Sequence, residues 1–201
     1  VETASGERMS YDRLVLAMGA TPRRIPDADG MDGVFELRHP EDAARLRAAA
    51  ADASSAIVIG GGYIGLEVAA TLAKSGKDVT VIEAAPRLLA RVASPAISAF
   101  FADLHAHAGT TVITDVGVED IAADHGGFSH ATLSDGRQLS ADMLVVAIGV
   151  TPETALAEAA GIETGNGILV DAGMQASMAG IYAIGDGALP VSYTHLTLPT
   201  I

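Results

Sequence analysis

The chain has 201 residues, of which 49% are hydrophobic and 18% charged, and its formal net charge is −13. This hydrophobic fraction excludes the composition of a disordered chain, and the length suffices to bury a sizeable core. The acidic balance argues against nucleic acid as a partner, since phosphate recognition relies on clustered Lys and Arg. The chain contains no cysteine, which excludes disulfides and thiol chemistry within it. Any redox chemistry would therefore belong to a bound cofactor.

The sequence shows no sign of a membrane segment. No run approaches the roughly 20 apolar residues that a spanning helix needs, and the N-terminus lacks the basic and then apolar pattern of a signal peptide. We therefore expect no membrane association and, by default, a cytoplasmic location. The sequence does not indicate an oligomeric state.

Apolar runs rich in Val and Ile alternate with helix-like stretches along the chain. This alternation is typical of an α/β protein whose parallel strands are buried on both faces. One predicted helix spans 40–51, where Pro40 and acidic residues begin an alanine-rich stretch. Another spans 94–108, with Ser94 as the expected N-cap and Pro95 next. The predicted strands are residues 14–17, 56–59, 78–82 and 143–148.

Residues 110–142 have a different pattern, with short β-prone pieces in place of long apolar runs. The pieces are TTVIT, FSHATL and RQLSADM, and Asp135-Gly136 is a hairpin-type turn signal. We expect a small antiparallel flap joined to the parallel sheet.

A nine-residue pattern occurs twice in the chain. LVLAMGATP at 14–22 and LVVAIGVTP at 144–152 share Leu, Val, Ala, Gly, Thr and Pro at the same spacing. Gly19 and Gly149 would let the backbone come close to a ligand at a strand end, and the following proline redirects the chain. We interpret the two copies as the entry to and the exit from an inserted domain. The alternative is that any buried strand ending in a turn has this form.

Three glycines, Gly60, Gly62 and Gly65, form a G-x-G-x-x-G pattern directly after the apolar run that ends at Ile59, and a helix-like stretch, 66–74, follows. The first glycine permits a tight turn, the second lets the backbone approach a pyrophosphate, and the third lets the helix pack closely on its strand. The pyrophosphate would lie at the helix N-terminus, where unpaired N–H groups point at it. The pattern predicts a dinucleotide site; a glycine-rich turn without a ligand is the alternative.

An acidic residue follows the glycines at the offset expected for such a site. Glu83 ends the next strand, where a carboxylate hydrogen-bonds the adenosine ribose. The 2′-phosphate of NADP would meet this carboxylate, and two like charges about 4 Å apart cost about 4 kcal/mol at an effective dielectric of 20. NADH is therefore favoured, unless Arg87 or Arg91 compensates. Arg87 taken alone is more simply an exposed loop arginine.

With these residues in view, the chain resembles the FAD-dependent pyridine-nucleotide oxidoreductases, and most closely the NADH-dependent ferredoxin, rubredoxin and putidaredoxin reductases. The resemblance runs from about Tyr11 to Ala188 and rests on YDRLVLAMGATPR, ELRHPEDAARLR, GGGYIGLEVAA, RVASPAISAFFADLHAHAG and IYAIGDGA. It implies electron transfer from NADH through FAD to a ferredoxin- or rubredoxin-type iron–sulfur protein. No catalytic acid or base is implied, because the cofactors perform the chemistry. One departure is Ala17-Met18-Gly19, where the family usually has ATG.

The resemblance also implies roles for single residues. Arg38 and Asp186 would contact FAD, whereas Tyr63 and Glu67 would line the nicotinamide site. Without the resemblance, Asp186 is equally well a turn residue, Tyr63 packs a helix and Glu67 is a surface charge. The expected NAD site comprises Gly60, Gly62, Tyr63, Ile64, Gly65, Glu67, Glu83, Arg91 and Gly149. The expected FAD site comprises Gly19, Arg38, Gly185 and Asp186.

The resemblance also sets the expected domain boundaries. Residues 1–21 would end a first FAD-domain segment, 22–147 would form the NAD-binding domain and 148–190 would begin a second, truncated FAD-domain segment. The expected fold is α/β: a Rossmann-like NAD domain, with parallel sheet and antiparallel flap, inserted in a partial FAD domain of the same class. The chain begins at Val1 without an initiator Met or an earlier glycine fingerprint, so we expect a fragment that is inactive alone. Because VSYTHL back-translates readily to a transposon-type sequencing adapter, we expect 191–201 to be non-native.

Other functions stay open from the sequence. The chain could belong to another FAD- and NAD(P)H-dependent oxidoreductase of this fold, such as a nitrite reductase subunit or a disulfide reductase. It could also be an NAD-binding module without catalytic turnover. The lack of cysteine does not separate these functions, because a disulfide reductase would have its cysteine pair upstream of this sequence.

A metal site is not expected. His105 and His107 are two positions apart on a predicted helix, so their side chains face different directions. His125 and His130 have no acidic or thiol partners at useful spacing.

Overall fold

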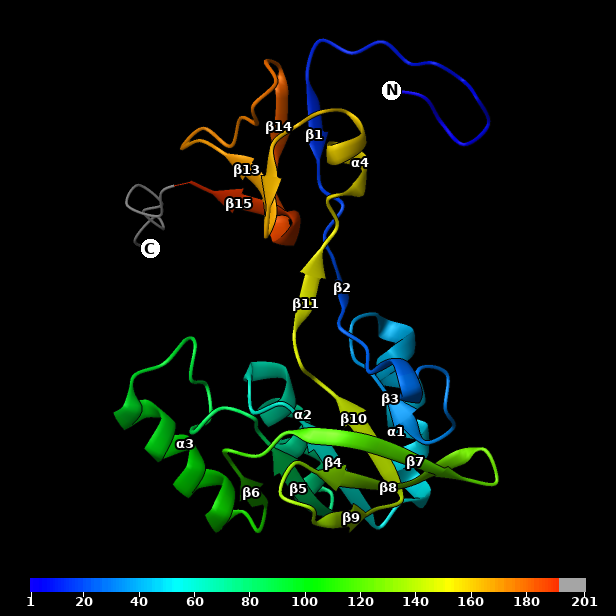
Figure 1. Cartoon of the computed structure of the whole chain (residues 1–201), viewed down its shortest axis with the longest axis vertical. Coiled ribbons are helices and arrows are strands. Elements are labelled where there is room, and N and C mark those ends of the chain that lie inside the picture. Colours follow the sequence, from blue (N-terminus) through cyan, green and yellow to red (C-terminus); the bar gives the residue numbers. More distant parts are fainter. Residues whose placement is uncertain (192–201) are drawn as a thin grey trace. The chain divides into compact units, whose positions relative to one another are not determined.

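The computed structural model describes residues 1–191, and the chain divides into two compact units (Figure 1). The larger unit is Pro22–Gly149. The smaller unit combines Val1–Thr21 with the described residues from Val150 onward. Residues 192–201, most of the segment expected to be non-native, lie outside the described part.

The larger unit is built on a parallel sheet of five strands in the order β3-β10-β4-β5-β6. The central strand β4 is almost wholly buried, and its neighbours β10 and β5 are buried along most of their length, which explains their continuous apolar runs. This sheet confirms the predicted α/β class. Its strands are β3 (Val34–Phe35), β10 (Met143–Val146), β4 (Ser55–Ile59), β5 (Asp78–Ile82) and β6 (Thr111–Ile113).

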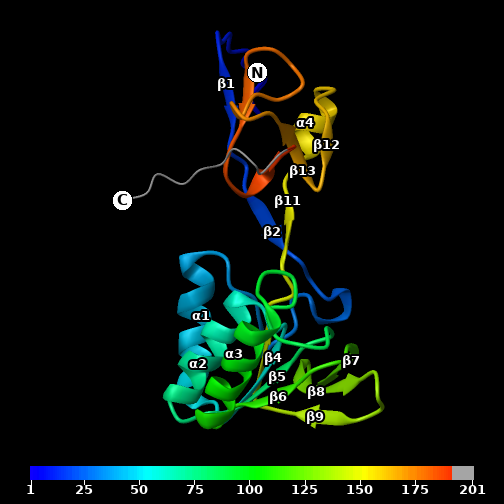
Figure 2. The same ribbon diagram turned by 90° about the vertical axis from the view of Figure 1, so that its left-hand side faces the viewer.

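Three helices cover one face of this sheet: α1 (Pro40–Asp52), α2 (Tyr63–Lys74) and α3 (Pro95–His107) (Figure 2). Val58 and Val81 point into the core on this face together with Leu66 of α2. The predicted helix starts at Pro40 and Ser94 are confirmed, and the Ser94 side chain accepts a hydrogen bond from the Ile97 amide. Helix α2 begins three residues before the predicted start, because Gly62 is its N-cap.

The opposite face is covered by an antiparallel sheet of three strands, β7 (Val118–Asp124), β8 (Gly127–Leu133) and β9 (Gln138–Ser140). Ile57 and Ile82 point to this side and share a core with Ile121 and Leu133 of the flap. Successive residues of a strand face opposite sides, so β4 supplies both cores. The predicted flap and its turn at Gly136, whose φ is +84°, are confirmed.

Part of the flap prediction was wrong. The piece TTVIT was assigned to the antiparallel flap, but Thr111–Ile113 forms β6, which pairs parallel with β5. The local β-propensity of three residues is the same in either sheet. The crossover through α3 decides the partner, because it returns the chain beside β5 in the same direction.

The smaller unit has its own small core, which includes Leu16, Ala157 and Ile168. Strand β1 (Leu14–Leu16) pairs parallel with β14 (Ile181–Ala183) and not with the five-stranded sheet. Only Leu16 of β1 is buried, whereas Val15 is 53% exposed, so the expectation of a fully buried strand was wrong here. The unit also contains α4 (Ala155–Ala159), β12 (Thr164–Gly165), β13 (Gly167–Val170), β15 (Ala188–Pro190) and the short 3₁₀ turn η2 (Gly185–Gly187).

The ends of the two LVxAxGxTP copies pair with each other. They form the two-stranded sheet of β2 (Ala20–Pro22) and β11 (Val150–Pro152). The chain passes between the two units at these two places. Within residues 1–191, no helix is both long enough and apolar enough to cross a membrane.

Candidate functional site

The carboxyl ends of three strands lie side by side in the larger unit. Val146, Ile59 and Ile82 are register partners at the ends of β10, β4 and β5. From β4 the chain continues outward through α2 and β5, whereas β10 lies on the other side of β4. In open α/β sheets, the crevice at such a reversal of strand order is where ligands bind. Gly60 and Glu83 follow directly after two of these strands.

Gly60 and Gly65 are both required by close packing. Gly60 has a φ of +109°, and a Cβ there would overlap the carbonyl oxygen of Ala147. A Cβ on Gly65 would overlap the carbonyl oxygen of Gly60. The first turn of α2 therefore lies directly against the glycine turn, which only glycine at both positions permits.

Gly62 differs from these two glycines, because a Cβ there would meet no atom within 4 Å. Its φ of −85° suits any residue, so neither packing nor backbone strain requires glycine. The first N–H groups of α2 begin here and have no partner within the helix. Tyr63 is 59% exposed and Ile64 43% exposed, and Glu67 is exposed one turn further along.

Glu83 is a half-buried carboxylate that already has two hydrogen bonds. Its Oε2 accepts from the Gly61 amide at 2.7 Å, and its Oε1 accepts from the Ala85 amide at 2.7 Å. Glu83 thus lies beside the glycine turn, where the sequence placed it. It also has a structural task that the sequence did not indicate, which is to fix the backbone of Gly61.

The two arginines after β5 behave differently. Arg87 is partly buried and donates to the carbonyls of Ala90 and Ala93 and to the hydroxyl of Ser98. The interpretation as an exposed loop arginine was therefore wrong. Arg91 is exposed, and its Nη2 lies 3.7 Å from the position of a Cβ on Gly149. The structure thus brings Arg91 beside Gly149.

Arg38 is exposed and lies just before α1. The Asp42 carboxylate fixes its backbone by accepting from the amides of His39 at 2.8 Å and Arg38 at 3.0 Å. These hydrogen bonds, that of His39 first, together with the Arg45 guanidinium, hold the pKa of Asp42 below its ordinary value despite its burial.

Three of the residues expected at an FAD site lie in the smaller unit. Gly19 and Gly185 each have a φ of +71°, a conformation that favours glycine. Asp186 is exposed in η2. A Cβ on the next residue, Gly187, would lie 3.2 Å from the Gly19 carbonyl oxygen. The structure therefore brings Gly19 and the Gly185–Gly187 turn together, while Arg38 belongs to the other unit.

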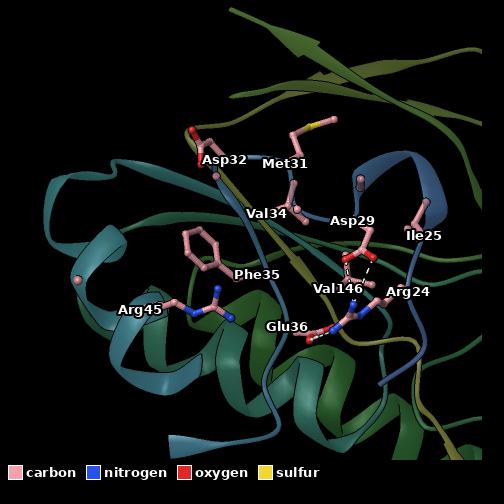
Figure 3. A pocket seen from close by; sticks show the side chains of 14 residues that line it. Arg24, Ile25, Asp29, Met31, Asp32, Val34, Phe35, Glu36, Arg45 and Val146 are labelled. Atoms are coloured by element: carbon pink, nitrogen blue, oxygen red, sulfur yellow. Dashed lines mark hydrogen bonds and ion pairs between the residues drawn. The ribbon is translucent and has the colours of Figure 1, made fainter. Parts of the chain in front are cut away.

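A cavity of about 490 Å³ lies in the larger unit beside the edge strand β3 (Figure 3). Arg24 lines this cavity and forms two ion pairs, from Nη2 to Glu36 Oε1 at 2.9 Å and from Nη1 to Asp29 Oδ1 at 3.2 Å. These charges satisfy one another, and none of the residues expected at the NAD or FAD site lines the cavity. The cavity is distinct from the glycine turn.

Sequence reasoning missed the residues that support the glycine turn from behind. They are Gly61, Leu88, Leu89 and Ser98. The middle glycine of the GGG run was a signal for the first of them. Leu88 and Leu89 lie in a loop without periodicity, and Ser98 lies in the first turn of α3, so only their contacts reveal their role.

Known proteins resemble this chain in sequence. Residues 1–198 match the pyridine nucleotide-disulphide oxidoreductase family. The chain is 40% identical over 190 residues to a rubredoxin-NAD(+) reductase of Pseudomonas putida, covering 94% of this chain and 49% of that protein. It is 41% identical over 191 residues to putidaredoxin reductase of the same organism, covering 92% of this chain and 45% of that protein. The chain thus spans about half the length of these curated relatives.

Solved structures show the same likeness. A ferredoxin reductase from Rhodopseudomonas palustris superposes with a TM-score of 0.89 at 42% identity, covering 94% of this chain and 47% of that one. A putidaredoxin reductase in covalent complex with putidaredoxin gives a TM-score of 0.88 at 40% identity and the same coverage. By sequence match and by fold, the chain belongs to the pyridine nucleotide-disulphide oxidoreductase family.

Proposed function

We propose that the chain is part of a flavoprotein reductase that passes electrons from NADH through FAD to a ferredoxin- or rubredoxin-type iron–sulfur protein. The observation that carries the proposal is the glycine turn. Gly60 and Gly65 bring the N-terminus of α2 against the end of β4, and Gly62 leaves open space in front of it. Such a helix N-terminus favours a phosphate group through its unpaired amides and its dipole.

The residues around this turn fit a dinucleotide. The amides of Gly62, Tyr63 and Ile64 would hold the pyrophosphate, and the Glu83 carboxylate has lone pairs left for ribose hydroxyls. The exposed ring of Tyr63 and the carboxylate of Glu67 would border the nicotinamide. Arg91 and Gly149, which lie together, would flank the site on the β10 side.

The preference for NADH over NADPH rests on Glu83 and Arg87. A 2′-phosphate near Glu83 would meet a like charge. Arg87 would have to break three hydrogen bonds to offset it. Of the two arginines after β5, the exposed Arg91 could compensate without breaking a hydrogen bond that holds the loop.

For FAD, we propose Gly19, Gly185 and Asp186 in the smaller unit and Arg38 at the start of α1. When bound, FAD would accept a hydride from NADH and release electrons singly. The left-handed glycines allow the backbone to come close to the cofactor, and the Asp186 carboxylate can accept hydrogen bonds from its hydroxyls. On this assignment, residues 22–147 bind NAD, and 1–21 with 148–190 belong to an FAD domain.

The choice of an iron–sulfur acceptor rests on graded similarity. Identity is 40% to 42% with the two structures of ferredoxin-type reductases. It is 33% with an NAD-dependent persulfide reductase and 28% with a water-forming NADH oxidase. We further propose a cytoplasmic location, where the proposed electron donor, NADH, would be available.

The test is to isolate the longer protein that contains this sequence and to record its visible spectrum and its NADH-dependent reduction of an artificial acceptor and of a [2Fe–2S] ferredoxin. We expect bound flavin and turnover with both acceptors. A colourless protein that binds NADH without reducing any acceptor would instead indicate a non-catalytic module. Turnover with a disulfide substrate alone would move the chain to another branch of the family.

A further inference from the structure

The segment between β5 and α3, residues 83–94, is folded back on itself by one side chain. The Arg87 guanidinium donates from Nη1 to the Ala93 carbonyl at 2.8 Å and to the Ser98 hydroxyl at 2.7 Å, and from Nη2 to the Ala90 carbonyl at 2.8 Å. Ser98 is buried in the first turn of α3, and its hydroxyl donates to the Leu88 carbonyl at 2.6 Å. The planar fork of arginine thus connects this segment to α3. We call this arrangement the Arg87 clip.

The clipped segment holds Gly61 from three sides. The Glu83 carboxylate accepts from the Gly61 amide, and the Leu89 amide donates to the Gly61 carbonyl at 2.9 Å. A Cβ on Gly61 would overlap the side chain of Leu88, which is almost fully buried. Gly61 is the residue between the first two glycines of the motif, so its backbone sets the course of the glycine turn.

Leu89 adopts a backbone conformation that a branched apolar residue rarely takes. Its φ is +53°. The conformation is maintained because Leu89 is buried and its carbonyl accepts from the amides of Val92 and Ala93 at 3.0 and 2.9 Å. Ala93 is also a partner of Arg87. If the clip were lost, we expect the segment to relax toward an ordinary conformation and to withdraw the Leu89 amide from Gly61.

The orientation of Gly61 determines where the next amide points. The carbonyl and the N–H of a trans peptide point in opposite directions, and the described residues contain no cis peptide. Because the Gly61 carbonyl points toward Leu89, the Gly62 N–H points away from it. The space around Gly62 is open. The clip therefore aims the Gly62 amide away from Leu89, the direction from which we expect a pyrophosphate to approach.

We propose that Arg87 is a positioning residue of the dinucleotide site, which acts through Leu89 and Gly61 and does not touch the dinucleotide. The proposal rests on the proposed function of the glycine turn. It assigns Arg87 a role that differs from charge compensation at an adenosine phosphate, because all its described hydrogen bonds go to groups of its own loop and of α3.

The test uses the 201-residue chain, NADH and two measurements. Calorimetry gives the dissociation constant for NADH, and amide hydrogen exchange without ligand gives the opening of the Leu89 amide relative to the core amides of Val58 and Val81. The variants are Arg87→Met, which keeps the apolar stem, and Ser98→Ala, which removes one partner of the clip. Arg137→Met is the control, because it also removes one positive charge but lies in the β8–β9 turn and pairs with Asp135.

We expect Arg87→Met to raise the dissociation constant about tenfold and Ser98→Ala to raise it less, the scale of losing hydrogen bonds to a charged group. In each of these two variants, the exchange rate of the Leu89 amide should rise by about the same factor as the dissociation constant, while the core amides exchange as before. In the Arg137→Met control, both the dissociation constant and the exchange rates should stay unchanged. Faster exchange of the core amides in Arg87→Met would mean that the whole fold is destabilised. The milder Ser98→Ala variant then provides the test.

Three results would overturn the proposal, and they are distinguishable. Faster exchange at Leu89 with unchanged NADH affinity would remove Arg87 from the site and leave the proposed function intact. Failure of the unaltered chain to bind NADH would remove both. Weaker binding of NADH with unchanged Leu89 exchange would show that Arg87 acts by its charge, which also contradicts the proposal.

Discussion

The glycine turn contains two kinds of glycine. Gly60 and Gly65 are required by contacts within the protein, because a Cβ on either would overlap a backbone carbonyl. Gly62 has open space around it and an ordinary φ, so only a ligand would require it to be glycine. Single substitutions can therefore separate stability from binding at neighbouring positions.

The first prediction compares Gly65→Ala with Gly62→Ala. Gly65→Ala should reduce the free energy of unfolding by about 1–3 kcal/mol, the usual cost of overpacking. Gly62→Ala should change it by less than about 0.5 kcal/mol but weaken NADH binding about tenfold, because the methyl group occupies the space of the pyrophosphate. Urea unfolding and calorimetry measure the two quantities. Equal effects of the two substitutions on stability would refute the distinction.

The second prediction concerns Glu83. Its two backbone partners would be disturbed by alanine, so Glu83→Gln is the better test, since the amide oxygen can keep one hydrogen bond without the charge. We expect the ratio of the NADPH to the NADH dissociation constant to fall by about tenfold, because the repulsion of a 2′-phosphate is removed. An unchanged ratio would exclude Glu83 as the selective group.

At the scale of the elements, two helices, α1 and α3, each bring a residue that fixes a neighbouring segment. Asp42 in α1 holds the backbone of Arg38 and His39, and Ser98 in α3 anchors the Arg87 clip. The last turn of α3 also contains a buried histidine, His105, whose Nδ1 has no hydrogen-bond partner within the described residues. The elements thus position loops as well as the core.

The third prediction is a pH dependence of stability that arises from His105. Burial lowers the pKa of His105 below its ordinary value of 6.5, so the folded state disfavours the proton that the unfolded state accepts. The contribution of neutral, buried His105 to the stability of the fold is therefore complete above pH 6.5. It is lost as the pH falls through the lower pKa of the folded state. The free energy of unfolding, measured with urea at pH 7.5 and at pH 5, should be smaller at pH 5. The substitution His105→Met should abolish this difference. The control His107→Met, at an exposed position, should retain the loss of stability at pH 5. If His105→Met loses as much stability at pH 5 as the unaltered chain, the assignment to His105 is contradicted.

At the scale of the whole molecule, the chain has two units with separate cores. The larger unit is continuous in sequence and contains every residue of the proposed NAD site. The smaller one is assembled from two distant segments and contains three of the four proposed FAD residues. Binding of NADH and binding of FAD should therefore depend differently on the rest of the protein.

The fourth prediction is that residues 22–149 alone fold and bind NADH with a dissociation constant within about twofold of that of the 201-residue chain, because a unit with its own core can fold independently. Circular dichroism and calorimetry on both polypeptides provide the test. Loss of folding in the shorter polypeptide would show that the smaller unit is needed for its stability.

The hypothesis that 191–201 is non-native is tested on the gene. When the locus is amplified and sequenced independently, we expect a different sequence in place of these codons. Their continuity with genuine downstream sequence would refute it.

Much of the fold could be predicted from local patterns. The periodicity of the apolar runs predicted the parallel strands, and Pro40, Ser94 and Asp135-Gly136 marked helix starts and a turn, because these signals depend on neighbouring residues only. The assignment of TTVIT to the flap failed because the partner of a short strand is chosen by the path of the chain. The prediction that Val15 is buried failed because burial depends on what covers a strand.

The sequence by itself determined the glycine motif, the acidic residue after β5 and the family resemblance, since spacing along the chain specifies a turn, a helix start and a strand end. Only the tertiary structure decided what surrounds them. It showed that Glu83 holds Gly61, that Arg87 is bound within its loop and that Leu89 is strained against the glycine turn. These contacts join residues from different elements, and their distances are set by packing, which no local pattern encodes.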